Sequence, residues 1–427
     1  MSGLSEGGVE RRSAGTRLRA GLRRHGLIPR PAELRRRLRA GDLEFTRGNA
    51  LELYPDGASG LAAMAEAIAA GRRRIHLESY ILRTDATGRA FLAALEERAR
   101  AGVEVRLLFD ALGSRGIDAA ALEPLRRAGA DVIAFNPLSR LYPRWAPRRR
   151  DHRKILVVDG QVAFTGGLNL GDEYAHGADF GRGPTGSWRD VHVRVEGPAV
   201  GLLEAVFVES WFRADGPDRP WTELRGPGPV PGGEAAVAVI PDGPTYHRRR
   251  MLELLLALLE GARERVQLAT PYFVPGRTLR AALRAAAERG VAVELLIAGA
   301  SDHPMLRWAA HALLPPLVEG GVRVFEFAGA MMHAKAAVFD GRLAVLGTSN
   351  LDRQSLQHSY EVNLAIEGGE LPGVLSRILA EDVAGAPELS GEALARRPWP
   401  RRARDRLAAF LLGRILEPIR KPLLIAG

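Results

Sequence analysis

Two stretches of the sequence share one pattern of polar residues. The first is His152-Arg153-Lys154-Ile155-Leu156-Val157-Val158-Asp159, and the second is His333-Ala334-Lys335-Ala336-Ala337-Val338-Phe339-Asp340. Both continue into a glycine and then an asparagine at matched steps, and each residue of the first copy lies 181 positions before its partner. Two copies in register make a chance match a poor explanation.

Lysine is rare in this chain, which makes its position informative. Of 60 lysine and arginine residues, only Lys154, Lys335 and Lys421 are lysines. Two of these three lie two residues after a histidine of the repeated pattern. Because arginine supplies positive charge almost everywhere else, the pattern indicates that a compact ammonium group is needed at these two positions.

The residues around each copy alternate between strand and helix patterns, which indicates an α/β layered fold. The turn Pro55-Asp56-Gly57 after the first strand is matched by Pro241-Asp242-Gly243 in the second half. We therefore predict two duplicated α/β domains related by a pseudo-twofold axis. Among the elements predicted for the second half are a strand at 265–274 and a helix at about 305–319.

Composition divides the chain into four parts, and a Gly/Pro-rich join at 226–233 separates the two halves. The predicted parts are a basic N-terminal segment at 1–40, a first domain at 41–225, a second domain at 226–395 and a basic amphipathic C-terminal segment at 396–427.

Charge is unevenly distributed along these parts. Residues 1–40 carry a net +8 and residues 396–427 a net +7; subtracting both from the total of +10 leaves −5 for the body. Basic ends on an acidic body favour an anionic surface over nucleic acid as partner. With no predicted signal peptide or bilayer-spanning run, we expect a peripheral protein on the cytoplasmic side of the cell membrane.

Both terminal segments allow two interpretations. Residues 1–40 form either two short basic amphipathic helices or a solvated leader. In the C-terminal segment, the predicted helix 401–416 carries Leu407, Phe410, Leu411 and Ile415 on one face. It either lies in a membrane interface or docks on the body.

The repeated residues predict phosphodiester chemistry. One neutral imidazole attacks and a second, protonated one donates to the leaving oxygen, both with pKa values near 6.5. Two ammonium groups hold the phosphate oxygens. No metal or other cofactor is expected, because the lysines supply the neutralising charge. The absence of cysteine excludes thiolate nucleophiles and cysteine-ligated metals.

Other residues complete the predicted site. Asn169 and Asn350 are expected to donate to the phosphate. Each histidine needs a carboxylate on its far nitrogen, and Asp190 and Glu361 are the candidates. The predicted catalytic set comprises His152, Lys154, Asp159, His333, Lys335 and Asp340, although the place of both aspartates, after a strand and before a glycine, also favours a turn.

At these residues the chain resembles the phospholipase D superfamily, whose signature is a doubled His-x-Lys-x4-Asp, and within it the bacterial cardiolipin synthases. The likeness covers about residues 45–370 and includes Thr165–Asn169, Trp188–His192 and Glu361–Asn363. It implies two phospholipase D-like domains with one active site at their interface. It also implies that Asp190 and Glu361 orient the catalytic histidines.

The resemblance implies a function as well. One histidine becomes phosphatidylated by phosphatidylglycerol, an anionic phospholipid, glycerol leaves, and a second phosphatidylglycerol attacks to give cardiolipin. We expect His152 to be the nucleophile and His333 the general acid; the pseudo-symmetry leaves the reverse open. The alternatives are a phospholipase D hydrolase, a transferase that uses another headgroup, a nuclease and a non-catalytic basic scaffold.

Overall fold

The computed structural model describes residues 44–137, 149–175, 188–217, 226–246, 249–329 and 331–415. The predicted basic segment 1–40 lies outside the described residues, and the C-terminal segment is described as far as Ile415. Across the described ranges, every helix is too short or too polar to cross a membrane.

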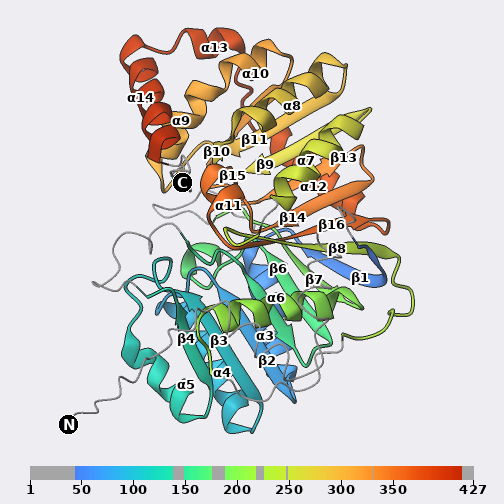
Figure 1. Ribbon diagram of the computed structural model, residues 1–427, viewed down its shortest axis with the longest axis vertical. Helices are drawn as coiled ribbons and strands as arrows, with labels where there is room; N and C mark the ends of the chain where they lie inside the picture. The colour runs from blue at the N-terminus through green and yellow to red at the C-terminus, as the bar shows by residue number, and fades with distance from the viewer. Residues whose placement is uncertain are drawn as a thin grey trace, which may run out of the picture.

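One 14-stranded sheet runs through the molecule, in the order β12-β11-β9-β13-β14-β16-β8-β1-β7-β6-β5-β2-β3-β4 (Figure 1). The strands of the first half are β1 Thr46–Tyr54, β2 Arg74–Ser79, β3 Glu104–Asp110, β4 Asp131–Phe135, β5 Ile155–Val158, β6 Val162–Gly166 and β7 His192–Glu196. Those of the second half are β8 Ala235–Asp242, β9 Arg265–Thr270, β11 Ala292–Ala298, β12 Arg323–Phe327, β13 Ala336–Phe339, β14 Leu343–Gly347 and β16 Glu361–Glu367.

The two halves of the sheet have the same topology. In each half the second, third and fourth strands are parallel and the remaining pairings are antiparallel. The first strands of the halves, β1 and β8, pair antiparallel at the centre. The predicted duplication therefore appears as one continuous sheet with a pseudo-twofold at its middle.

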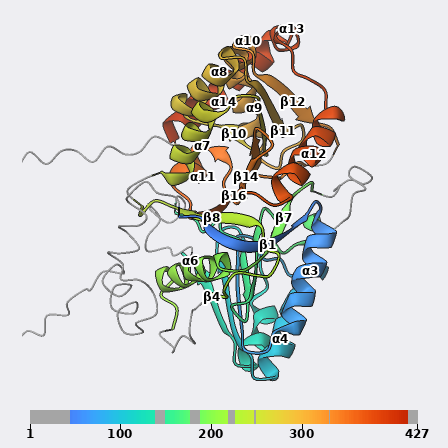
Figure 2. The ribbon, with the colours of Figure 1, turned by 90° about the vertical axis from the view of Figure 1, so that its right-hand side faces the viewer.

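Helices cover both faces of this sheet. In the first half α6 lies on one face and α3 and α4 on the other (Figure 2). The helices of the first half are α3 Gly57–Ala70, α4 Ala86–Arg100, η1 Ala119–Leu122, α5 Glu123–Arg127, η2 Asp172–Tyr174 and α6 Ala199–Arg213. Those of the second half are α7 Arg250–Gly261, α8 Arg277–Glu288, α9 Pro304–Leu313, α10 Pro315–Glu319, α11 Arg353–Gln357, α12 Leu371–Ala384, α13 Gly391–Ala395 and α14 Trp399–Ile415.

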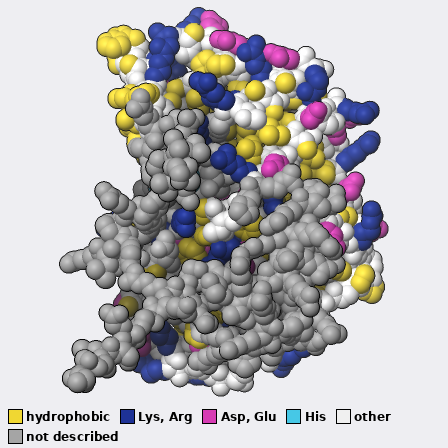
Figure 3. Space-filling view, viewed as in Figure 1, with side chains coloured by type: hydrophobic (Ala, Val, Ile, Leu, Met, Phe, Trp, Pro, Cys, Tyr) yellow, Lys and Arg dark blue, Asp and Glu magenta, His cyan; other side chains and the backbone are white. Residues whose placement is uncertain are grey.

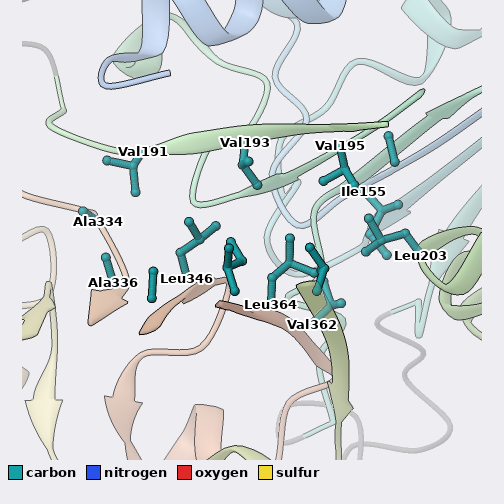
Figure 4. Close-up of a cluster of buried hydrophobic side chains, with 14 of the residues drawn as sticks. Ile155, Val191, Val193, Val195, Leu203, Ala334, Ala336, Leu346, Val362 and Leu364 are labelled. Carbon is teal, nitrogen blue, oxygen red and sulfur yellow. The ribbon is translucent and has the colours of Figure 1, made fainter. Parts of the chain in front are cut away.

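Four clusters of buried hydrophobic side chains hold the described layers, and one of them is shared by the two halves. It brings Val193 and Leu203 of the first half against Leu346 and Leu364 of the second (Figure 4). Because each buried aliphatic side chain contributes about 1.5–3 kcal/mol, this core fixes the halves to each other. The strands that lead out of the two motifs, β5 and β13, are buried at every position.

Two predicted elements of the second half are wrong in detail. The expected helix 305–319 is divided into α9 and α10, because Pro315 cannot continue the backbone hydrogen bonding of α9. The expected strand 265–274 ends at Thr270. Its continuation, β10 Phe273–Val274, pairs in a separate small sheet with β15 Leu351–Asp352, which directly follows Asn350.

Candidate active site

The two motifs meet at the contact between the halves, where backbone hydrogen bonds cross from one half to the other. The amide of His152 donates to the carbonyl of Tyr360 at 2.9 Å, and the amide of His333 donates to the carbonyl of Arg189 at 2.6 Å. Tyr360 and Arg189 immediately precede Glu361 and Asp190. Each histidine is therefore placed next to the candidate carboxylate of the opposite half.

The histidine–carboxylate pairs are accordingly crossed. His152 Nδ1 lies 3.0 Å from Glu361 Oε2, and His333 Nδ1 lies 2.7 Å from Asp190 Oδ2. Thr348 adds a hydroxyl that donates to Glu361 at 2.5 Å. Since Nδ1 is held by the carboxylate, Nε2 is the nitrogen of each ring that is left for chemistry.

The two lysines lie beside these pairs and are buried. Lys154 Nζ donates to the carbonyl of His152 at 2.8 Å, and Lys335 Nζ donates to the carbonyl of His333. Burial lowers the pKa of Lys154 to about 8 and that of Lys335 to about 7, although Glu361 and Asp190 act in the opposite direction. At neutral pH the site therefore holds ammonium groups that lose a proton readily.

The same environment acts on the other titratable groups. Burial first, and then the charges of Lys154 and Lys335, lower the pKa of both histidines well below the ordinary value. Burial raises the pKa of Asp190 to about 6 and that of Glu361 to about 7. Both histidines are thus neutral in the free site at neutral pH, which differs from the expectation of one protonated histidine.

Aromatic rings enclose the two histidines. The Tyr80 ring lies 4.7 Å from the ring of His152, and Lys154 Nζ lies 5.4 Å from the Tyr80 centroid. Tyr174 and Trp188 lie 5.5 and 5.1 Å from the ring of His333. Sequence reasoning did not assign these aromatic residues to the site, because only their packing in the fold reveals it.

The two asparagines differ in their surroundings. Asn169 accepts from the amide of Ile81 at 3.0 Å and donates to the hydroxyl of Tyr174 at 2.7 Å. Its amide therefore connects parts of the protein. Asn350 is also buried, but in the described part of the chain its Oδ1 has no hydrogen-bond partner. The unpartnered atom of Asn350 is an acceptor, so it does not itself supply the donor that a phosphate ligand needs.

Asp159 and Asp340 lie at the far ends of β5 and β13, roughly 16 Å along the strand from each motif lysine. Asp159 accepts from the amides of Arg72, Arg73 and Arg74 at 2.7–2.9 Å. Asp340 accepts in the same way from three successive amides at 263–265. Both aspartates have positive φ, 55° and 49°. A catalytic role does not fit this placement; they anchor the starts of β2 and β9.

Arg153, the middle residue of the first motif, was missed by sequence reasoning. Its guanidinium is fully buried and donates to the carbonyl of Glu361 at 3.2 Å and to Ser210 Oγ at 2.8 Å. It also pairs with Glu209 at 3.0 Å. The equivalent position in the second motif is an alanine. Arg153 therefore connects the first motif to the opposite half. Comparing the two motifs could not reveal this role, because the second motif has no arginine at the matching position.

Comparison with known proteins shows the family of the chain. A family profile described as "Cardiolipin synthase, PLD-like domain" matches residues 64–177 and 255–383, so it covers both motifs. The chain belongs to the phospholipase D-like cardiolipin synthase family. This synthase-family chain is 34% identical over 388 residues to a cardiolipin synthase of Geobacillus kaustophilus, which covers 90% of the chain and 75% of that protein.

Two further relatives extend the comparison. The synthase-family chain is 32% identical to a probable cardiolipin synthase of Bacillus subtilis, with 88% of the chain and 74% of that protein covered. Its fold is similar to that of a phosphatidylserine synthase of Haemophilus influenzae, with a TM-score of 0.67 over 90% of the chain and 98% of that structure. At 15% identity, this second likeness concerns the fold alone.

Proposed function

We propose that the protein is a phosphatidyltransferase that condenses two phosphatidylglycerol molecules to cardiolipin and glycerol through a phosphohistidine. The observation that carries the proposal is the crossed arrangement of two histidine–carboxylate pairs around two buried lysines. One group for attack, one for proton transfer and two for charge neutralisation are what a phosphodiester exchange requires.

The reaction proceeds in two displacements. Nε2 of His152 attacks the phosphorus of the first phosphatidylglycerol, the bond from phosphorus to the glycerol oxygen breaks, and His333 gives its proton to that oxygen. The hydroxyl of a second phosphatidylglycerol then gives its proton to His333 and attacks the phosphorus, and His152 leaves. Glu361 and Asp190 hold the Nδ1 protons of the two rings throughout.

The first step requires a protonated His333, which takes its proton from water once the bound substrate has raised its pKa. In the free site both rings are neutral, so His152 is ready to attack. An anionic phosphodiester bound between the ammonium groups offsets their charge and raises the pKa of His333. The ring of His152 is 12% exposed and that of His333 is 5% exposed, which supports His152 as the group that meets the incoming lipid.

Product analysis tests the proposed function. Purified protein is incubated with phosphatidylglycerol vesicles, with and without excess glycerol, and the lipids are separated. We expect cardiolipin and free glycerol, with reversal by added glycerol. Phosphatidic acid alone would make the protein a hydrolase. Absence of turnover, together with cleavage of duplex DNA, would favour a nuclease.

Activity is expected to be highest near neutral pH. From about pH 7 upward, Lys335 and then Lys154 lose their protons, because burial lowers their pKa values to about 7 and about 8. From about pH 7 downward, Glu361 and then Asp190 become protonated, because burial raises their pKa values to about 7 and about 6. The profile of kcat/KM against pH should therefore be bell-shaped. A continuous rise to pH 10 would contradict this assignment.

Gly167 offers a test of the carboxylate's position. A Cβ at this residue would lie 1.9 Å from Asp190 Oδ1, so Gly167→Ala should displace the carboxylate and with it His333. We expect kcat to fall about 100-fold, as for a misplacement of about 1 Å. Gly261→Ala is the matched control, since its Cβ would meet no atom within 4 Å. Equal kcat for the two variants would show that catalysis does not depend on the position of the Asp190 carboxylate.

We also propose that the protein binds the cytoplasmic side of the cell membrane peripherally, through its basic ends. Five of the net positive charges of these ends would contribute about 5 kcal/mol at an anionic surface, at about 1 kcal/mol each. Membrane binding should then weaken as salt is added. Retention on membranes at high salt, measured by sedimentation, would contradict a mainly electrostatic attachment.

A further inference from the structure

The C-terminal helix α14 packs on α9 through a side that carries small and aliphatic residues and one buried carboxylate. Asp405 and Ala408 are buried, and Asp405 pairs with Arg397 and Arg404 at 2.8 Å. The guanidinium of Arg404 lies 4.3 Å from the ring centroid of Trp308 on α9. The helix is therefore docked on the body through Ala408, Leu412 and the contact of Arg404 with Trp308, while the ion pairs of Asp405 lie within the C-terminal segment.

The large apolar residues of α14 face outward instead. Leu407, Phe410 and Leu411 are 57%, 55% and 40% exposed, and Trp399 at the start of the helix is 74% exposed. Together with Met305 of α9, these are all the exposed large hydrophobic side chains in the described ranges. Figure 3 shows apolar side chains beside basic ones on this face. A gathered apolar surface of this kind marks an interaction site.

A basic hollow lies next to this apolar surface. Arg277, Arg280 and Arg284 project from one face of α8 into a hollow of about 280 Å³, which Leu313 of α9 also lines. Within the described residues, the buried Nε of Arg280 has no hydrogen-bond partner. Burial, and then the charges of Arg277 and Arg353, lower the pKa of Arg280. The hollow therefore has positive charge and an unused donor, which fit a phosphate group.

The hollow, the helix and the active site are connected. The charge of Arg353 helps to lower the pKa of Arg280. The Arg353 guanidinium also donates to the carbonyl of Gly413, near the end of α14, at 3.2 Å. At its other end, α9 begins just after Asp302, whose carboxylate accepts from the hydroxyl of Tyr272 at 2.5 Å. The negative charge of Asp302 also acts to raise the pKa values of His333 and Lys335. Val274 of β10 also packs with Ala309 of α9 and Ala408 of α14, and β10 pairs with β15 directly after Asn350, so the surface adjoins the predicted site.

We propose that the face formed by α8, α9 and α14 docks on an anionic lipid bilayer. Leu407, Phe410 and Leu411 enter the boundary between headgroups and acyl chains, and the arginines of α8 hold lipid phosphates. The exposed apolar side chains and the adjacent positive charge together fit this partner, because a bilayer surface presents phosphates directly above an apolar layer. The proposal rests on the proposed function in that the substrate is taken from the same bilayer.

Insertion can be measured directly because the chain has no cysteine. An environment-sensitive dye attached to Leu411→Cys should shift its emission to the blue when vesicles of phosphatidylglycerol are added, and lipids with a quencher in the acyl chain should quench it. The same dye on Arg100→Cys, exposed on α4 in the first half, should show neither change. If the protein sediments with the vesicles while the dye at position 411 stays in water, the proposal is wrong.

The arginines are tested by charge removal. Binding to phosphatidylglycerol vesicles should weaken at least about tenfold in a triple variant with Arg277→Gln, Arg280→Gln and Arg284→Gln. The matched control removes three exposed charges of the first half with Arg72→Gln, Arg100→Gln and Arg127→Gln and should bind as the unchanged protein does. Equal weakening in the two triple variants would overturn the role of the α8 arginines.

Two further experiments distinguish lipid phosphate from free phosphate and test the docking proposal separately from the proposed function. Glycerol phosphate at millimolar concentration should not displace the protein from vesicles; if it does so fully, the hollow binds free phosphates and the docking proposal fails. Turnover of short-chain phosphatidylglycerol dispersed in detergent reports the proposed function without a bilayer. Turnover without dye insertion would overturn docking alone, and insertion without turnover would overturn the proposed function alone.

Discussion

Replacing His152 by alanine should lower the rate of cardiolipin formation by about 10⁵-fold or more, since the covalent route then has no nucleophile. The fold should persist, because the ring of His152 lies at the edge of the site and the surrounding cores do not depend on it. Activity is measured with phosphatidylglycerol in detergent, and folding is checked by thermal unfolding. A loss of only a few-fold would contradict the role of His152.

His333→Ala distinguishes the two histidines. With an activated phosphatidyl ester such as one of p-nitrophenol, the leaving group needs no proton, so this variant should still release a first equivalent of nitrophenol. His152→Ala should release none, because the phosphorus is not attacked. A burst from the His152 variant and none from the His333 variant would reverse the assignment, which the pseudo-symmetry of the halves permits.

The second large effect is expected at the lysines. Lys335→Ala or Lys154→Ala should each lower kcat by about 100- to 1,000-fold, because each removes a charge that stabilises the transition state in a buried site. Arginine should restore little of the activity. Each compact ammonium group donates to the backbone carbonyl of the histidine two residues before it. A larger, planar guanidinium does not fit the same space.

The matched control is Arg342→Ala, which removes an exposed positive charge from the turn between β13 and β14. Its kcat should be that of the unchanged protein. If both lysine variants keep normal lipid turnover, the protein is not a catalyst of the proposed kind, and a scaffold that binds anionic lipids becomes the better account.

Much of the fold was predictable because it is duplicated. The constant spacing between His152 and His333 requires two similar frameworks, and the strand and helix patterns repeat around them. The spacing does not show which carboxylate pairs with which histidine. The crossed pairing of His152 with Glu361 and of His333 with Asp190 depends on the pseudo-twofold at the centre of the sheet, which no local pattern records.

Residue roles were less predictable than residue positions. Asp159 and Asp340 belong to the repeated signature, yet their carboxylates bind backbone amides at strand ends. In α14 the leucine face was predicted, but its direction was not, because the helix packs on α9 through its other side, which carries Ala408 and Leu412. Pattern therefore identified the groups, and the fold decided what each of them touches.

The central claim is that a single covalent intermediate forms at a site shared by both halves. The most direct test is to mix the protein with phosphatidylglycerol, stop the reaction within one turnover under alkaline conditions, digest it and identify modified peptides by mass spectrometry. The account predicts a phosphatidyl group on the peptide with His152 and none on the peptide with His333. Cardiolipin formation without any modified histidine would contradict it.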